Sequence, residues 1–284
     1  MTASDTVNKV SQKEWRAQLD LGFTESNGRT VLSHRNHYGP LQVQKPFYPE
    51  ENGTSHVYVL HPPGGVVGGD NLKVNVEVHE NAHTLITTPT AGKFYRSSGP
   101  VAHQSQNIKV AANGILEWFP SENIIFSGAN IRINTQIDLA SDSQFIGWDV
   151  LCLGRPTSGE NFDSGFLNQR MEIHRDGVPL KIENLQLQGG SASLDAKWGL
   201  MGYPVIGNMI CATDKKEIVD SIRNIEKDSP KNEMFSVTHT EGIVFCRFLG
   251  DSVERAKVFF VKAWKIFRSA IMGLDIVEPR IWKT

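Results

Sequence analysis

The chain is dominated by short runs in which apolar and polar residues alternate, a pattern typical of β-strands with one buried face. The clearest runs are 72–78, with Leu72, Val74 and Val76 on one side, and 131–139. Ten more strands are expected over 41–47, 56–61, 82–88, 108–112, 115–119, 144–153, 166–174, 180–187, 205–212 and 242–249. Asn113-Gly114 predicts a hairpin between 108–112 and 115–119, and Asp176-Gly177 predicts a further turn.

Two segments have helical periodicity instead. Residues 215–227 place Ile218, Ile222 and Ile225 on one face of a short amphipathic helix. A longer helix is predicted from an N-cap at Asp251 to a C-cap at Gly273. Its charged residues occupy about half of the circumference, and the rest is apolar or aromatic: the charged set is Arg255, Lys257, Lys262, Lys265 and Arg268.

These patterns predict a mainly β fold, a single domain over residues 1–284. We expect many short strands in a β-helix-like arrangement or in stacked sheets, with about two α-helices, the longer one C-terminal. No fixed repeat period is present. Residues 1–14 are polar and are expected to form a disordered leader.

Composition narrows the class of protein. The 284 residues carry a net charge of −2, so neither nucleic acid nor an acidic membrane surface is an expected partner. No run is long enough to span a membrane, and no signal peptide is recognisable at the N-terminus. The three cysteines (Cys152, Cys211 and Cys246) lie far apart in apolar runs, which argues against a disulfide framework. We therefore expect a cytoplasmic protein.

A glycine-rich stretch from His61 to Asp70 precedes the strand at 72–78. It is not a Walker A loop, because it has no Lys followed by Ser or Thr, and the strand after it excludes the dinucleotide-binding fingerprint. On these residues alone it is a structural β-turn or bulge that ends in one carboxylate.

Carboxylates on the apolar side of a predicted strand are the anomalies of this sequence, because burial of an unpaired charge is costly. Asp149 shares its side with Leu151 and Leu153, Glu117 shares its side with Ile115 and Phe119, and Glu183 shares its side with Leu185 and Leu187. With Asp70, they are candidates for an interior polar site. The alternative is a buried ion pair, with Arg155 or Arg170 as possible partners.

No motif of a nucleophilic or zinc enzyme is present. Carboxylates in a β-rich protein suit either ion handling or glycoside hydrolysis, and their spacing does not choose between these. The alternative function is therefore a β-rich, carboxylate-dependent hydrolase.

Five motifs, in this order, resemble the urease accessory protein D family (UreD, also called UreH). They are HPPGGVVGGD (61–70), TTPTAGKFYRS (87–97), LEWFPSENIIFSGA (116–129), WDVLCLGRP (148–156) and PRIW (279–282). The resemblance extends over nearly the whole chain from Trp15 and includes GPLQVQKPFYPE (39–50).

This resemblance implies a urease maturation factor without enzymatic activity. Family members assemble with UreF and the GTPase UreG, as a dimer of heterotrimers, and the complex docks on apo-urease (UreABC). GTP-dependent insertion of nickel follows, and nickel is thought to pass through an internal tunnel. No tightly bound cofactor is implied, only transient nickel(II). A scaffold without metal contact is a further alternative.

The resemblance and the residue patterns together give candidate site residues: Asp70 and Asp149 lie in family motifs, whereas Glu183 follows from strand parity. Asp70, Asp149 and Glu183 are the candidate nickel-transit carboxylates, and His61 and Glu117 are weaker metal-ligand candidates. Phe260, Trp264 and Phe267, on the wide apolar face of the C-terminal helix, are candidates for contact with a helical partner such as UreF.

Overall fold

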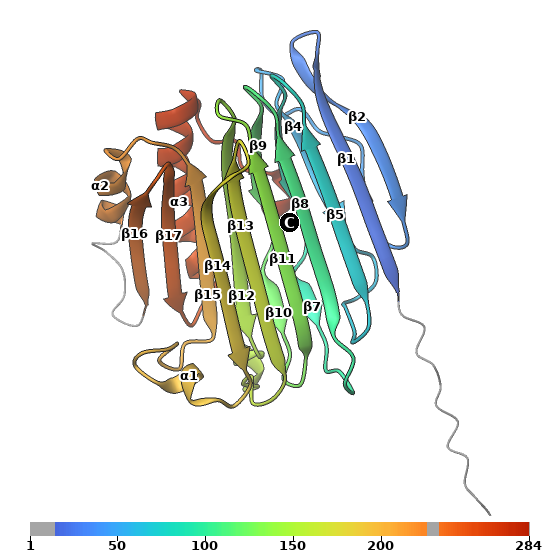
Figure 1. Ribbon diagram of the computed structural model, residues 1–284, viewed down its shortest axis with the longest axis vertical. Coiled ribbons are helices and arrows are strands. Elements are labelled where there is room, and N and C mark those ends of the chain that lie inside the picture. The colour runs from blue at the N-terminus through green and yellow to red at the C-terminus, as the bar shows by residue number, and fades with distance from the viewer. Residues whose placement is uncertain (1–14, 226–232, 284) are drawn as a thin grey trace, which may run out of the picture.

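The computed structural model describes residues 15–225 and 233–283, and its body consists of two stacked β-sheets with helices against one of them (Figure 1). The expected mainly β fold with stacked sheets is confirmed. The predicted disordered leader, residues 1–14, lies outside the described residues.

Sheet one has seven strands. In spatial order they are β14 (Val178–Gln188), β13 (Phe166–Arg175), β11 (Asn130–Leu139), β8 (Ala102–Val110), β5 (Asn71–Val78), β1 (Arg16–Ser26) and β2 (Arg29–Tyr38).

Sheet two has ten strands. Eight follow one another as β16 (Met234–Thr240), β17 (Ile243–Gly250), β15 (Val205–Ala212), β12 (Gln144–Leu153), β9 (Ile115–Phe119), β6 (His83–Thr87), β4 (Ser55–Leu60) and β3 (Gln42–Val43). The short β10 (Asn123–Ile125) pairs with β12 and with β7 (Gly92–Phe94).

From β4 to β13 the chain passes back and forth between the sheets. The strands β5, β8, β11 and β13 are parallel neighbours in sheet one, and β4, β6, β9 and β12 are parallel neighbours in sheet two. This coiled path is the β-helix-like feature of the expected fold.

The predicted hairpin at Asn113-Gly114 is wrong. The turn itself is present, with Asn113 at φ 54°, but β8 before it belongs to sheet one and β9 after it belongs to sheet two. The turn is therefore a corner between sheets. Asp176-Gly177, by contrast, joins the antiparallel neighbours β13 and β14.

Apolar side chains form two buried layers. The layer between the sheets includes Leu19, Val76, Ile137 and Leu151, and the layer between sheet two and the helices includes Trp148, Phe260 and Trp264. The strand β12 contributes to both, because alternate residues point to opposite faces.

Three α-helices occur in the described residues: α1 (Ala192–Asp195), α2 (Ile218–Arg223) and α3 (Val253–Met272). The sequence predicted α2 and α3. Ser252 caps α3 instead of the predicted Asp251, while Gly273 ends it at φ 68° as expected. Two 3₁₀ turns cover Pro156–Ser158 and Arg280–Lys283. Among the described residues, no helix has the length and apolar character needed to cross a membrane.

Candidate functional site

A band of polar side chains crosses the interior between the two sheets. These residues alternate with core residues on the inward face of sheet one; Gln169, for example, lies between Leu167 and Met171. Four adjacent strands contribute, and their registers place the polar residues in two neighbouring rows. We call this set the polar belt: Gln104 and Gln106 of β8, Thr135 of β11, Gln169 of β13 and Glu183 of β14, with Asp149 of β12 and Asn208 of β15 facing it from sheet two.

Hydrogen bonds connect members of the belt. Thr135 Oγ1 donates to Gln106 Oε1 at 3.0 Å, within sheet one. Gln169 Nε2 donates to Asp149 Oδ2 at 3.0 Å, which links the two sheets. Asp149 is the register partner of Asn208, whose side chain also hydrogen-bonds to it. Two of the predicted carboxylates, Asp149 and Glu183, thus belong to one interior site.

Asp149 is the electrostatic anomaly of the belt. The pKa of Asp149 is raised from 3.8 to about 6, mainly by desolvation and to a smaller extent by the charge of Glu183, although hydrogen bonds from Gln169 and Asn208 act in the opposite direction. Within the described residues no Lys, Arg or His forms an ion pair with it. The side chain is half-buried, not fully buried as expected. Asp149 is therefore an incompletely compensated negative charge between the sheets.

One end of the belt opens into a cleft of about 390 Å³, lined by residues that include Gln169, Glu183, Asn208 and Arg247. Glu183 forms ion pairs with Arg247 of β17 and, at 3.2 Å, with Lys181. The alternative of an ion pair is therefore confirmed for Glu183, but the suggested partners Arg155 and Arg170 are wrong, because they pair with Glu160 and Glu172.

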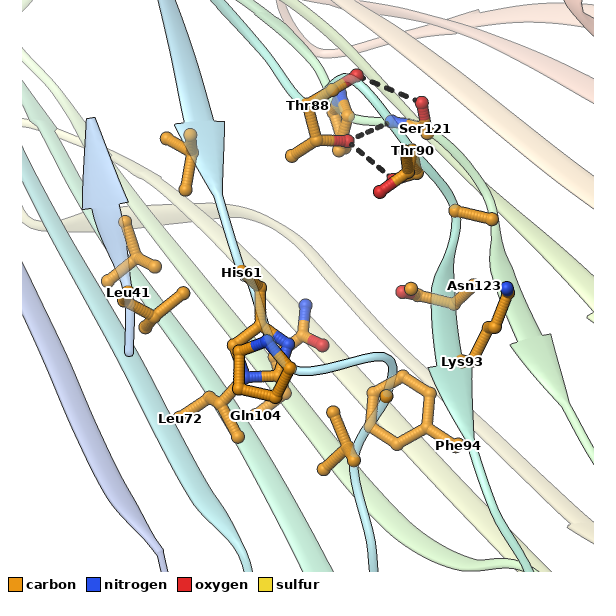
Figure 2. A pocket seen from close by; sticks show the side chains of 18 of the residues that line it. Leu41, His61, Leu72, Thr88, Thr90, Lys93, Phe94, Gln104, Ser121 and Asn123 are labelled. Atoms are coloured by element: carbon orange, nitrogen blue, oxygen red, sulfur yellow. Dashed lines mark hydrogen bonds between the residues drawn. The ribbon is translucent and has the colours of Figure 1, made fainter. Parts of the chain in front are cut away.

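The other end of the belt reaches a pocket of about 320 Å³ (Figure 2). Gln104 and Gln106 line it from sheet one, and Trp118 lines it from sheet two. In Figure 2, Thr88, Thr90 and Ser121 form a hydrogen-bonded group at one side, where Ser121 N donates to Thr88 Oγ1 at 2.8 Å.

His61 lies on the wall of the same pocket. Burial lowers its pKa, and the charge of Asp70 opposes that shift in part. An imidazole with a lowered pKa keeps a free ring nitrogen at neutral pH, as a metal ligand requires. The structure therefore places His61 at the pocket end of the belt.

Asp70 lies outside the belt and closes the glycine turn. Its two carboxylate oxygens accept hydrogen bonds from the backbone N–H groups of Val67, at 2.9 Å, and Trp15, at 3.3 Å. The turn is tight: a Cβ on Gly68 would lie 2.1 Å from Ser97 Oγ, whereas one on Gly64 would meet nothing within 4 Å. These contacts give Asp70 a role in the fold.

Glu117 is fully buried, as predicted, but on the other face of sheet two, under α3. It accepts hydrogen bonds from Trp264 Nε1 and, if His83 Nε2 carries the proton, from His83 at 2.8 Å. Arg268 Nη2 lies 3.4 Å from it. Glu117 is thus part of a buried ion network separate from the polar belt.

Arg268 joins this network to the loop before β4. It is completely buried, contrary to its expected place on the charged face of α3, and its Nη2 donates to Glu50 at 2.5 Å. Glu50 also lies 2.7 Å from His56 Nε2. The network fixes the last turns of α3 to sheet two.

The prediction that Phe260, Trp264 and Phe267 contact a partner is wrong for the folded chain. All three have no exposed surface and pack against sheet two. The wide apolar face of α3 is needed to cover that sheet. Among its apolar residues Val258 is the large one that is well exposed, at 44%.

Five belt residues carry amides or hydroxyls and were not predicted, because only carboxylates were taken as anomalies: Gln104, Gln106, Thr135, Gln169 and Asn208. Gln104 and Gln106 share their side of β8 with Ala102 and Ile108, and Asn208 lies between Ile206 and Ile210 in the same way. Amides and hydroxyls on the apolar side of a strand are the same kind of signal as carboxylates, only weaker. The positions of Gln104, Gln106 and Asn208 beside apolar residues of the same parity therefore indicate the belt in the sequence itself.

Comparison with known proteins gives the chain's family. The family model described as UreD urease accessory protein matches residues 16–283. The chain belongs to the UreD family. It is 41% identical to urease accessory protein UreD 2 of Brucella anthropi, over 95% of this chain and 98% of that protein. It is also 41% identical to UreD of Alcanivorax borkumensis, over 96% and 93% of the two chains, and 40% identical to UreD of Citrobacter koseri, over 99% and 96%.

Membership of the UreD family decides between the classes of function that the sequence left open. The chain is a urease accessory protein with a role in urease maturation, and it is not an enzyme. The hydrolase alternative is therefore rejected. In residues 15–225 and 233–283, no three His, Cys, Asp or Glu side chains are grouped to hold a metal ion.

Proposed function

We propose that this UreD protein carries nickel(II) along its polar belt during urease maturation. It acts in the cytoplasm with UreF and the GTPase UreG, as a dimer of heterotrimers docked on apo-urease (UreABC). Nickel is the cargo and binds transiently. This chain has no Walker A motif, so GTP hydrolysis belongs to the partner.

The observation that carries the proposal is the incompletely compensated carboxylate of Asp149. A carboxylate whose pKa is raised by desolvation, with only amides as hydrogen-bond partners, is stabilised when a cation comes near. Nickel(II) accepts carboxylate and imidazole ligands. The site therefore attracts the cargo.

The surroundings of Asp149 support transit over storage. Conduction requires binding that is strong enough for entry and weak enough for release, with several sites in series. The belt offers single oxygen ligands in sequence: the amides of Gln104 and Gln106, the Thr135 hydroxyl, the Gln169 amide and Asp149. Each can replace part of the ion's hydration shell without closing a cage.

The two ends of the belt supply an entrance and an exit. His61 stands at the pocket end with a lowered pKa, so that its imidazole is available as a ligand at neutral pH. At the cleft end Glu183 is held between Arg247 and Lys181, two cations that offset its charge and weaken its hold on the ion. A carboxylate that binds the ion weakly favours its release to the next protein.

Deletion and complementation test the proposal. The deletion strain should make all urease subunits but leave them without nickel, and the wild-type gene should restore nickel. Genes that carry Asp149→Asn or Glu183→Gln should restore assembly of the complex, measured by pull-down. The urease from these strains should nevertheless contain less nickel per active site than with the wild-type gene. Asp70→Asn changes the turn and should alter folding more than transit.

Two results would contradict the proposal. Full nickel content in the deletion strain would refute the maturation role in that host. Normal complex formation with normal nickel loading in both Asp149→Asn and Glu183→Gln would refute the transit role and leave a scaffold.

A further inference from the structure

Sheet two extends beyond the edge of sheet one. Sheet one ends at β14, which pairs with β13 alone among the described strands, whereas sheet two continues past it through β17 and β16 (Figure 1). Glu183 of β14 pairs with Arg247 of β17, and Lys181 Nζ lies 5.5 Å from the centre of the Phe245 ring. The strand β14 therefore lies over β17, and none of the strands that the structure describes in sheet one lies above β16.

The uncovered face of β16 forms a ledge. On its other face Phe235 and Val237 are buried against the helical layer. The residues of the uncovered face continue the inward-facing rows of β17, as the pairing of Ser236 with Arg247 shows. We define the ledge as Met234, Ser236, Thr238 and Thr240 of β16, all exposed, together with Arg247 of β17.

The free edge of β14 faces this ledge. An edge strand presents a row of unpaired N–H and C=O groups, and proteins guard such edges with proline and lysine. Pro179 and Lys181 guard the start of β14, but residues 182–188 contain neither proline nor lysine. Ile182, Asn184 and Gln186 are exposed along this part. Along 182–188 the backbone groups that point away from β13 are thus open to pairing, apart from the Gln188 carbonyl, which accepts a hydrogen bond from Ser191 N.

The dimensions of the ledge fit one more strand. A strand paired with β14 would lie about 4.8 Å from it and about 10 Å from the sheet below, which is the position above β16. The ledge is lined mainly by small hydroxyl side chains, which suit close packing of a polar strand face. The ion group at its inner side is positive, because Lys181 and Arg247 share the single carboxylate of Glu183.

We propose that a protein partner adds an extended, acidic segment to β14 as an eighth strand of sheet one, over the ledge. Its backbone pairs with residues 182–188, and a carboxylate of the segment faces Arg247, whose side chain is 48% exposed. The added strand lies beside the cleft where the polar belt opens. The identity of the partner, UreF or apo-urease, rests on the proposed function; the mode of binding does not.

Hydrogen exchange of the backbone amides tests this mode. The complexes with UreF and with apo-urease are compared with the free chain. In one of them the amides of 182–188 that point away from β13 should exchange at least about tenfold more slowly, since they gain hydrogen bonds. The opposite edge strand β2 serves as the internal reference and should keep its rates.

A pair of tryptophan substitutions tests the ledge. Thr238→Trp fills the ledge and should weaken the same complex at least about tenfold. Asn134→Trp adds the same side chain at an exposed position on the outer face of β11 and should leave binding unchanged. Equal urea midpoints for both variants establish that they are folded.

The outcomes separate this inference from the proposed function. The complexes could form and deliver nickel while the backbone amides of 182–188 exchange as fast as in the free chain. That result would refute strand addition and leave the transit role standing. If Thr238→Trp weakens binding without any protection of these amides, the ledge is covered by something other than a strand, and the inference is again refuted. If neither protein binds, both proposals fail.

Discussion

Replacing Asp149 by asparagine should stabilise the folded protein at neutral pH, although it removes a polar group from the interior. The asparagine side chain keeps the shape of the carboxylate and can still accept the hydrogen bond from Gln169. It loses the charge that desolvation and Glu183 disfavour. If Asp149 instead supported the fold, Asp149→Asn would be less stable than the wild type.

The magnitude follows from the pKa of Asp149. Its shift from 3.8 to about 6 means that ionised Asp149 destabilises the native state. At 1.36 kcal/mol per pKa unit the cost is at most about 3 kcal/mol, and partial exposure reduces it. With roughly 2–4 °C per kcal/mol for chains of this size, the melting temperature should rise by at most roughly 6–12 °C.

The pH dependence has a definite sign. Between pH 3.8 and about 6 the native state binds more protons at Asp149 than the unfolded state, so its contribution to stability falls as the pH rises. The cost is complete above pH 6 and absent below 3.8. The gain from Asp149→Asn should therefore be full at pH 7–8 and vanish near pH 4.

Urea unfolding of the wild type and of Asp149→Asn at pH 4, 5, 6, 7 and 8 measures this difference. Asp142→Asn, at an exposed position just before β12, is the matched control and should show no such trend. A loss of stability in Asp149→Asn that is constant with pH would refute the reasoning, because Asp149 would then support the fold through its hydrogen bonds.

Two further predictions concern the fold around the site. Arg268→Met should lower the free energy of unfolding by about 3–5 kcal/mol in urea titrations, because Glu50 and Glu117 would remain buried without their arginine. The additional substitution Glu117→Gln should recover part of this loss. An unchanged urea midpoint in Arg268→Met would show that the network does not stabilise the fold. Gly68→Ala should lower the melting temperature, since its Cβ would lie 2.1 Å from a neighbouring oxygen, and Gly64→Ala should leave it unchanged; equal effects of the two would contradict the tight turn.

Much of the fold follows from local pattern. Alternation placed most strands, and parity put Asp149 with Leu151 and Glu183 with Leu187 on apolar sides, which in the structure face the layer between the sheets. Parity succeeds here because a β-strand has a period of two and the apolar side must be buried.

What parity could not decide is which buried face a residue joins. Glu117 is as buried as predicted, but it lies under α3 and not between the sheets. The hairpin prediction at Asn113-Gly114 failed for the same reason: the turn type is local, whereas the sheet that the next strand joins depends on distant strands.

The C-terminal helix shows the limit of periodicity most clearly. Arg268 falls on the charged face by position, yet it is buried because Glu50, 218 residues earlier, supplies a carboxylate. Phe260, Trp264 and Phe267 form an apolar face that suits a partner as well as a core. These side chains belong to the core because sheet two lies beneath them, and the helix sequence alone does not show that.

Nickel transfer in the presence of a chelator tests the internal route most directly. The purified complex of this UreD protein with UreF and UreG is loaded with nickel, then mixed with GTP, apo-urease and an external chelator too large to enter the belt. Thr135→Phe narrows the belt, and Asn134→Phe, the neighbouring residue on the outer face of β11, is the control. We predict that the wild type and Asn134→Phe activate urease despite the chelator, and that Thr135→Phe, folded and assembled, does not. Activation by Thr135→Phe equal to that of the wild type, or complete loss of the wild-type activation to the chelator, would contradict transit through the belt.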